Sequence, residues 1–553
     1  MTSAALPQGQ AAGPPSAGGP GLVGPGVSNR GRAASPKPLG TRLAGLTLAG
    51  LLGLGLWAVW VNLGQAGTLT DAWFNLRRFA ARVGPLRFPP LGELVSLTAL
   101  TLGTVILGTL LAAVLSVPVA WASAGPTAPN AFVRATGRFI GVLSRAIPDV
   151  VMAMVFVLMF SLGALPGILA FGLHSVGMIS RLFADAIEQS DPGPRLAIRA
   201  TGGSKVQEFT SGILPQVFPS WVATVLHRAD INLRGSVILG YAGVAGLGLA
   251  MRNAFAVLDY SLGLGIALVI LLLCAVMEFV SSAARKRLQG LSGAAAGSKA
   301  RRRRPPGLWV GGFAALVGAS IWVCHISWRD LFSFWGYVPG VAASFWPPNT
   351  GSYGLGRFSQ ALMTTLGIAL AAVVISLLGS VVLGSLAARN VAPNRTIRSV
   401  CRGLLVFIRA IPELVVAIVL IVVTGLGAPA GVMALGICGV GLLGKLIADS
   451  IEENPPGPET ALKATGATRL QRYTGATLPA ARRAVIGHVF YLLDTNIRSA
   501  TILGVVGGGG IGYYLLTASQ GARYGQVTLI VGMVVVVVLA LEGLTIWLRK
   551  ALQ

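Results

Sequence analysis

The sequence carries few charged residues. Asp, Glu, Lys and Arg make up 11% of its 553 residues, whereas a soluble domain carries about 25%. Hydrophobic residues reach 54%, and the mean hydropathy is +0.73. This shortage of charge excludes an ordinary soluble globular protein and indicates a chain that is surrounded mostly by lipid.

Cysteine and histidine are also scarce, with four of each. Neither set has the spacing of a metal site, and the histidines do not recur in the internal repeat described below. We therefore expect no metal site, and we expect the cysteines to be core residues. The residues concerned are Cys274, Cys324, Cys401, Cys438, His174, His227, His325 and His488.

Acidic residues are outnumbered by basic ones, 18 against 43, which gives a net charge of +25. Such an excess is compatible with nucleic-acid binding. Most of it, however, falls in loops that would face anionic lipid headgroups. We therefore expect this positive charge to face the lipid bilayer, and we expect the protein to bind no nucleic acid.

Two nucleotide-binding motifs are incomplete. The segment 439–445 fits the pattern G-x-x-x-x-G-K, but Leu446 stands where Ser or Thr must hold the magnesium ion. The segment 507–512 fits G-x-G-x-x-G without the βαβ unit that this fingerprint requires. We expect neither segment to bind a nucleotide, so the chain should have no ATPase of its own and no bound cofactor.

The sequence does contain a long internal repeat. The segment 192–202 reads PGPRLAIRATG, and the segment 456–466 reads PGPETALKATG. Seven of these eleven positions match. The offset between these two segments, here called the repeat offset, also relates 145–148 to 409–412 and 230–234 to 494–498. A gapless repeat over this distance indicates two copies of one module.

Apolar runs of about 20 residues, long enough to cross a bilayer, recur throughout both copies. They lie near residues 43–64, 95–122, 138–162, 164–186, 222–250 and 259–282, and near 307–326, 358–388, 400–424, 427–449, 484–517 and 525–547. We predict an all-α polytopic membrane protein with about 12 transmembrane helices in two parallel six-helix repeats. The predicted units are a disordered cytoplasmic tail at 1–42, a first repeat at 43–284, a basic cytoplasmic linker at 285–306 and a second repeat at 307–553.

The positions of Lys and Arg set the expected orientation. The linker at 285–306 and the loop at 389–402 are basic, which places both in the cytoplasm together with the N-terminus. The loop at 65–94 is basic as well but would lie outside. Because each copy has an even number of spans, both termini should be cytoplasmic.

Ionisable residues inside the predicted spans are costly to bury in lipid, which makes them candidates for function. They occur in both copies as oppositely charged residues four positions apart, a spacing that places both on one helix face. The pairs either neutralise one another structurally or take part in transport. They are Arg145 with Asp149, Arg181 with Asp185, Asp230 with Arg234, Arg409 with Glu413, Lys445 with Asp449, and Asp494 with Arg498.

Arg234 is expected near the middle of the membrane. It lies 15 residues beyond Pro219, about 22 Å along a helix. If its span faces the corresponding span of the other copy, Asn232 and Arg234 meet Asn496 and Arg498 around one central pathway. A guanidinium binds oxyanions through paired donors, so this arrangement favours an anionic solute such as phosphate or phosphonate. The alternative is that each arginine is satisfied by its own carboxylate.

The repeated segments 192–202 and 456–466 lie between predicted spans. Their Ala, Thr and Gly residues are small, which lets another protein approach closely, and a short helix is well suited to a partner's groove. We predict that both segments dock a partner. A re-entrant or merely solvated loop is the alternative.

One stretch of the second copy carries a family resemblance. The segment 452–467, EENPPGPETALKATGA, with Leu478-Pro479 after it, resembles the coupling motif of permease subunits of ATP-binding-cassette (ABC) importers. The segments 409–413 and 494–512 resemble more narrowly the phosphonate-importer permease. The first copy is more divergent, since YAGVAGLG at 241–248 replaces the Gly-rich tail. The resemblance covers roughly residues 90–285 and 350–550, and it implies two permease modules fused in one chain with type I ABC importer architecture.

The resemblance implies the permease of an ATP-driven importer that moves a phosphorus oxyanion (phosphonate, phosphite or phosphate) into the cytoplasm by alternating access. The implied partners are two ABC ATPase subunits, which hold ATP and Mg, and a solute-binding protein outside the bacterial cytoplasmic (inner) membrane. The implied ATPase-coupling residues are Glu188, Ala197, Ala200, Thr201, Gly202, Glu452, Ala461, Ala464, Thr465 and Gly466. Gly246, Gly248, Gly509, Gly510 and Gly512 would either pack helices closely or flex at a gate.

Other functions remain open at this point. Permeases for methionine or another amino acid share the coupling motif, and an ion-coupled secondary transporter also uses twofold repeats and charges inside the membrane. A membrane scaffold or channel would show no solute-dependent ATP turnover. A secondary transporter would need no docking segment and would work without an ATPase.

Overall fold

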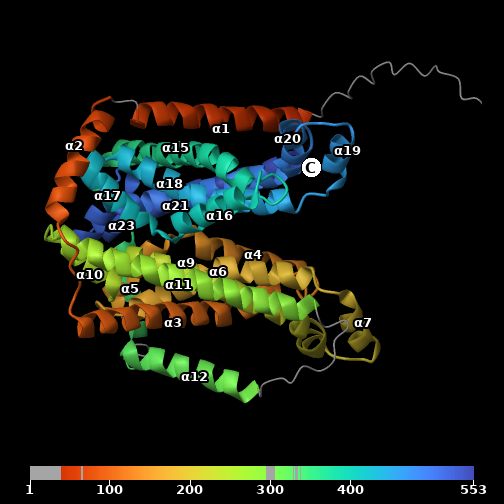
Figure 1. Cartoon of the computed structure of the whole chain (residues 1–553). Helices are drawn as coiled ribbons and strands as arrows, with labels where there is room; N and C mark the ends of the chain where they lie inside the picture. The colour runs from red at the N-terminus through yellow and green to blue at the C-terminus, as the bar shows by residue number, and fades with distance from the viewer. Residues whose placement is uncertain are drawn as a thin grey trace, which may run out of the picture.

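The computed structural model describes residues 39–63, 66–293, 306–327, 329, 334–336 and 338–552, and these residues form a helical bundle without a named strand (Figure 1). The first half contains α1 (Leu39–Leu63), α2 (Ala66–Val83), α3 (Leu91–Ser123), α4 (Ala131–Ala146), α5 (Asp149–Phe160), α6 (Leu165–Glu188), α7 (Pro192–Ala200), α8 (Lys205–Gln207), the π-helix η1 (Glu208–Ile213), α9 (Leu214–Tyr241), α10 (Leu247–Ala256) and α11 (Tyr260–Gly293). The second half contains α12 (Pro306–Val323), the 3₁₀-helix η2 (Phe334–Gly336), α14 (Val338–Phe345), α15 (Gly354–Ala387), α16 (Arg395–Ala410), α17 (Glu413–Thr424), α18 (Ala428–Glu452), α19 (Gly457–Ala464), α20 (Arg469–Arg472), the π-helix η3 (Tyr473–Thr477), α21 (Leu478–Val505), α22 (Ile511–Gln520) and α23 (Tyr524–Leu552). Most of the predicted tail and the centre of the predicted linker lie outside the described residues.

Every predicted apolar run falls on helix. By length and composition, seven of the described helices are candidate membrane spans, or nine if each of two bent helix pairs counts as one. The other three runs fall on α12, whose described apolar part is short, and on α9 and α21, each 28 residues long. The charges of the repeated Asp-x-Asn-x-Arg segments lie on α9 and α21 and make these two helices less apolar than the others.

The predicted spans 138–162 and 400–424 are not straight helices. Each is a pair, α4 with α5 and α16 with α17, bent by 82° at its break. The break falls at Ile147-Pro148 and Ile411-Pro412. Proline has no N–H to continue the helix, and it forces the residue before it out of the helical conformation. The prediction of continuous spans is therefore wrong here.

The predicted spans 222–250 and 484–517 are also interrupted. In the first, α9 ends at Tyr241 and α10 begins at Leu247, and Gly246 between them has a φ of +134°. In the second, α21 ends at Val505, and Gly509 and Gly510 both have a φ of +79° before α22 begins. Positive φ is readily adopted by glycine, so these residues make the sharp turn between the helices.

The glycines that follow each turn serve close packing. A Cβ added to Gly248 would lie 2.6 Å from the carbonyl oxygen of Ser236, and one added to Gly512 would lie 1.8 Å from that of Thr501. The short helices α10 and α22 therefore fold back against α9 and α21. Of the two roles predicted for these glycines, the geometry supports packing.

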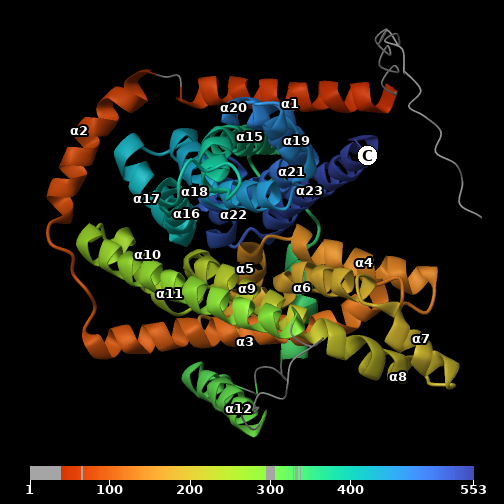
Figure 2. The same ribbon diagram turned by 45° about the vertical axis from the view of Figure 1, so that its right-hand side comes forward.

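The two halves exchange their first helices. Helix α1 lies along α15 of the second half, and α12 lies along α3 of the first half (Figures 1 and 2). The contacts are close, since a Cβ on Gly55 would lie 2.5 Å from Val374, and one on Gly103 would lie 2.9 Å from Cys324. The predicted boundary at 285–306 divides the repeats along the sequence, but each packed half takes its first helix from the other repeat.

The segment 65–94, predicted as a basic loop, contains the helix α2. Helix α2 crosses the end of the bundle opposite α7 and α19 and leads from α1 to α3 (Figures 1 and 2). Asn75 donates from Nδ2 to the carbonyl oxygen of Val423 at 3.0 Å, and the ring of Phe79 stacks edge-on against Tyr260. Helix α2 thereby ties the exchanged helix α1 to both halves.

Candidate functional site

The predicted docking segments form short helices at one end of the bundle. Helices α7 and α19 both project there (Figure 1). Two residues after each helix comes a glycine in the left-handed conformation, Gly202 with a φ of +79° and Gly466 with a φ of +80°. The small residues of the motif are exposed and available to a partner: Ala197, Ala200, Thr201, Ala461, Ala464 and Thr465.

Glu188 and Glu452, which were grouped with these segments, point back into the bundle. Glu188 accepts hydrogen bonds from the backbone N–H of Gly125 at 3.0 Å and from Arg138 at 3.4 Å. Glu452 accepts from the backbone N–H of Arg389 at 2.6 Å and from Arg402 at 2.9 Å. These bonds connect the ends of α6 and α18, which lead into α7 and α19, to the loop before α4 or α16 and to the middle of that helix.

Arg234 and Arg498 each reach across to the other repeat. Arg234 donates from Nη1 to the carbonyl oxygen of Arg409 at 3.0 Å, and Arg498 donates to the carbonyl oxygen of Arg145 at 3.1 Å. Both carbonyls belong to the last turn of a broken helix, where carbonyls have no partner within the helix. The two arginines therefore stabilise the breaks in α16 and α4.

Two of the six predicted charge pairs are present. Arg234 contacts Asp230 through a hydrogen-bonded ion pair, and Arg498 contacts Asp494 at 2.8 Å. These pairs lie within α9 and α21, which are continuous at these positions, so the spacing of four residues does bring the partners together.

Arg145 and Arg409 have other partners than those predicted. Arg145 forms an ion pair with Glu542 on α23, and Arg409 lies 3.6 Å from Glu278 on α11. The predicted partners Asp149 and Glu413 follow the breaks and begin α5 and α17, so they do not share a helix face with the arginines. Pairing within one helix is therefore wrong at this place.

The predicted pairs on α6 and α18 are not formed either. No ion pair within 4 Å joins the side chains of Arg181 and Asp185, both described, although the two interact electrostatically. Lys445 lies 3.9 Å from Glu278, and Asp449 lies 3.9 Å from Arg402. A neighbouring helix supplies a nearer partner in each of these last two cases.

Glu278 and Glu542 were missed by the sequence analysis, although the signal was available. They are related by the repeat offset, as the other paired segments are. The ion pairs Arg145–Glu542 and Arg409–Glu278 are therefore reciprocal, each joining one repeat to the other. They form two clusters, of which the first contains Asp230, Arg234, Glu278, Arg409 and Lys445, and the second contains Asp494, Arg498, Glu542, Arg145 and Arg181.

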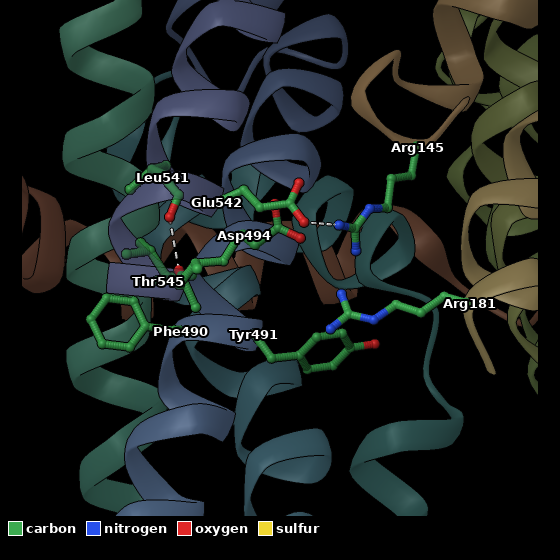
Figure 3. A pocket seen from close by; sticks show the side chains of 10 residues that line it. Arg145, Arg181, Phe490, Tyr491, Asp494, Leu541, Glu542 and Thr545 are labelled. Carbon is green, nitrogen blue, oxygen red and sulfur yellow. Dashed lines mark hydrogen bonds and ion pairs between the residues drawn. The ribbon is translucent and has the colours of Figure 1, made fainter. Parts of the chain in front are cut away.

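The two clusters differ in their exposure. In the first cluster the side chain of Asp230 is 0% exposed, and Glu278 has cations within 4 Å on three sides, Arg234, Arg409 and Lys445. In the second cluster the side chain of Asp494 is 27% exposed. A pocket of about 110 Å³ adjoins it, lined by Arg145, Arg181, Tyr491, Asp494 and Glu542 among others (Figure 3).

Asn232 and Asn496, predicted on the pathway, are both buried. Asn232 donates from Nδ2 to Thr109 Oγ1 at 2.9 Å and accepts from Ser175 at 3.3 Å. Asn496 Nδ2 has no hydrogen-bond partner among the described residues. The residue that corresponds to Thr109 in the second repeat is Val373, which cannot accept a hydrogen bond. Asn232 therefore serves to hold α9 against α3 and α6.

Arg228 is a further buried charge that sequence reasoning missed. It donates from Nε to Ser175 at 2.8 Å and from Nη1 to the sulfur of Met178 at 3.4 Å. The corresponding residue of the second repeat is Leu492. A search restricted to charges that recur in both copies cannot find a residue of this kind.

Comparison with known proteins identifies the repeated module. The family model of the binding-protein-dependent transport system inner membrane component matches residues 116–290 and 380–553. The chain belongs to this family. The starts of the two matched segments are related by the repeat offset, so the permease contains the module once in each repeat.

Several curated proteins are similar to this permease. A phosphate-import permease protein of Mycolicibacterium smegmatis is 38% identical over 488 residues, which cover 88% of this chain and 90% of that protein. A phosphite transport system permease protein of Stutzerimonas stutzeri is 34% identical and covers 43% of this chain and 86% of its own length. A probable D-methionine transport system permease protein of Pasteurella multocida is 26% identical over 28% of this chain.

Family membership confirms the predicted fold class, two repeats of an all-α ABC importer permease module. It also makes the chain a transport component of the inner membrane that crosses it several times. ATPase and solute-binding proteins are the general partners of such permeases. Helices α7 and α19, which the sequence analysis predicted to dock a partner, are exposed and occur once in each repeat.

Proposed function

We propose that this permease moves a phosphorus oxyanion, such as phosphate, phosphite or a phosphonate, into the cytoplasm. The named activities of two relatives, phosphate import and phosphite transport, support this class of solute. The observation that carries the proposal is the pair Arg234 and Arg498, one on each of two long helices and each bound across the contact between the repeats. Guanidinium groups bind oxyanions through paired, charge-assisted hydrogen bonds.

Two ABC ATPase subunits are proposed to dock on α7 and α19 and to hold ATP and Mg, while the permease binds no cofactor and hydrolyses no ATP. Movement of a docking helix would pass through Glu188 to Arg138 of α4, or through Glu452 to Arg402 of α16. Helices α4 and α16 end at the breaks that Arg498 and Arg234 hold. The proposed coupling route therefore runs from the ATPase through these side-chain hydrogen bonds and along α4 or α16 to the proposed pathway.

The solute would bind by replacing the carbonyl oxygen that accepts a hydrogen bond from one of the two arginines. Arg498 is held by Asp494 and by a carbonyl oxygen, both of which are acceptors, as an oxyanion is. When the repeats move apart, the carbonyl is withdrawn and the guanidinium regains donors for a solute. Gly246, Gly509 and Gly510 would let the adjoining helices turn, whereas Gly248 and Gly512 would keep α10 and α22 packed.

The proposed orientation has both termini in the cytoplasm, together with α7, α19 and the linker at 285–306. It places α2 on the outer side, where a solute-binding protein would deliver the solute. The repeats are proposed to extend over 43–284 and 307–553, with a cytoplasmic tail at 1–42.

Uptake measurements in cells that lack this chain test the proposal. The cells are complemented with the wild type or with a double variant, Arg234→Gln and Arg498→Gln, and are given labelled aminoethylphosphonate, phosphite, phosphate or methionine. We expect the wild type to restore uptake of at least one phosphorus oxyanion and the double variant to restore none at normal membrane levels. Normal transport by the double variant would show that the arginines are structural.

Methionine is the second candidate solute, supported by the methionine permease relative. If methionine is the only solute taken up, the protein is still an ABC importer permease, but the proposal of a phosphorus oxyanion is wrong. Uptake that persists without the ATPase subunits would instead indicate an ion-coupled secondary transporter.

A further inference from the structure

We propose that the pocket of the second cluster is a binding site for a phosphate-type oxyanion and that the first cluster has no such site. The inference deepens the proposed function, on which it rests, by assigning the solute to one side of the repeat contact. The pocket lies among α4 and α6 of the first repeat and α21 and α23 of the second (Figure 3).

The charges around the pocket leave one cation available. Asp494 is neutralised by Arg498 at 2.8 Å, and Glu542 is neutralised by Arg145. Arg181 is exposed and makes no hydrogen bond or ion pair within 4 Å to any described residue. Its guanidinium enters the pocket from the same side as that of Arg145 (Figure 3). Asp185, one turn along α6, interacts electrostatically with Arg181 but forms no ion pair with it within 4 Å. A bound anion would therefore meet a guanidinium that no carboxylate contacts directly.

The pocket also offers a neutral donor and sufficient room. Tyr491 lines it, is 41% exposed, and its hydroxyl makes no hydrogen bond to a described residue. The volume of about 110 Å³ equals that of several water molecules at about 30 Å³ each. An anion of one phosphorus and four surrounding atoms fits such a space, whereas a nucleotide does not.

The corresponding position in the first cluster is occupied by protein. Lys445, the counterpart of Arg181, lies 3.9 Å from Glu278. Asp230, the counterpart of Asp494, has a fully buried side chain, and Arg409 lies 3.6 Å from it. The Glu278 carboxylate thus lies among these cations, in the place that a bound anion would take. The packing around the first cluster therefore explains why only the second cluster has a proposed site.

The pocket adjoins the proposed pathway and faces the docking end. Asp494 belongs to both the pocket and the ion pair with Arg498. Arg181 is seven residues from the end of α6, about 10 Å along the helix, and α7 follows directly. An oxyanion released by Arg498 would therefore reach Arg181 on its way to the cytoplasm.

Equilibrium binding to the complete complex tests the proposal. The permease with its ATPases is placed in phosphatidylcholine nanodiscs, and binding of radiolabelled inorganic phosphate is measured without the solute-binding protein. We expect Arg181→Gln to weaken phosphate binding about tenfold or more, because a charge-assisted bidentate contact is lost. Arg181→Lys keeps the positive charge and should weaken phosphate binding less than Arg181→Gln does. Binding by Arg181→Lys also shows that substitution at this exposed position leaves the fold intact.

The pseudosymmetric variant Lys445→Gln is the matched comparison, and Arg482→Gln controls for loss of a surface charge on α21. Both should change phosphate binding less than twofold. Equal loss from Arg181→Gln and Lys445→Gln, or wild-type binding by Arg181→Gln, would overturn the assignment to one side. If the wild type imports a phosphorus oxyanion and Arg181→Gln still binds phosphate normally, the pocket inference fails while the proposed function stands.

A lipid headgroup presents the same phosphate chemistry, so a second arm uses phosphatidylglycerol nanodiscs and counts retained lipids by native mass spectrometry. Retention of phosphatidylglycerol that depends on Arg181, without binding of inorganic phosphate, assigns the pocket to lipid and removes it from the solute route. Binding of inorganic phosphate that depends on Arg181 in both lipids assigns it to the solute.

Discussion

The first and second clusters are built from corresponding residues, yet their surroundings differ. Each has three cations and two carboxylates, and the repeat offset relates every member of one cluster to its counterpart in the other. In the first, Glu278 is surrounded by three cations, and in the second, Glu542 pairs with Arg145 beside a pocket. The duplication has therefore preserved the charges while the packing around them has diverged, which gives one closed and one open side.

Replacing Glu278 or Glu542, one at a time, should reveal the largest difference in stability between the two clusters. Glu278→Gln leaves three cations with Asp230 alone in a mostly buried place, and unpairing a buried charge costs about 3–5 kcal/mol. Glu542→Gln acts at a pair whose side chains are 22% and 23% exposed, so solvent screens the charges in part and a smaller loss is expected. Thermal unfolding of the purified complex measures both, and equal shifts in Tm would contradict the difference between the clusters.

Charge exchange sharpens the same comparison. In the second cluster, Arg145→Glu and Glu542→Arg should each reduce uptake, and the double exchange should restore it, because these two side chains pair mainly with each other. Coupling energies of contacting residues are about 0.5–3 kcal/mol. In the first cluster, Arg409→Glu with Glu278→Arg should remain defective, since Glu278 also contacts Arg234 and Lys445.

Rescue of uptake in both double exchanges, or in neither, would contradict this prediction. Membrane levels of each variant provide the control, because loss of folded protein would lower uptake without any change in the pathway.

The two asparagines should show the smallest difference. Asn232→Leu removes hydrogen bonds to Thr109 and Ser175 and leaves the Thr109 hydroxyl without its side-chain partner, while Ser175 keeps the bond from Arg228, at a cost of about 1–3 kcal/mol. Asn496→Leu should be nearly neutral, because its Nδ2 already lacks a partner. Val373→Thr should stabilise the protein by about 1 kcal/mol in the wild type and not in Asn496→Leu. Thermal unfolding again supplies the values, and a larger loss for Asn496→Leu than for Asn232→Leu would refute the assignment.

Local sequence patterns predicted most of the fold. Hydropathy placed every predicted span on helix, because lipid demands long apolar helices, although seven to nine of the twelve are candidate membrane spans by length and composition among the described residues. The gapless offset revealed the duplication. The breaks at Pro148 and Pro412 were not predicted, although proline carries the physical reason for them. The exchange of α1 and α12 could not be predicted from the sequence, because a helix that packs on the other repeat has the same kind of composition as one that packs on its own.

The site was predicted in part for a similar reason. Spacing along a helix correctly paired Arg234 with Asp230, because both lie on one uninterrupted helix. The same rule failed for Arg145, whose partner Glu542 is 397 residues away in the chain. Contacts between helices depend on their packing, and the repeat offset was the one sequence signal that related Glu278 to Glu542.

The most direct test of the account is ATP-driven uptake of labelled phosphorus oxyanion per folded permease, measured in vesicles that contain the ATPases, for Arg234→Gln and Arg498→Gln separately. The account predicts that Arg498→Gln loses most uptake, about tenfold or more, at a normal membrane level. Arg234→Gln should retain more uptake per folded molecule, because the first cluster offers the solute no open site. Wild-type rates per permease in both variants would contradict a route along these arginines, and equal losses would contradict the inequality of the two sides.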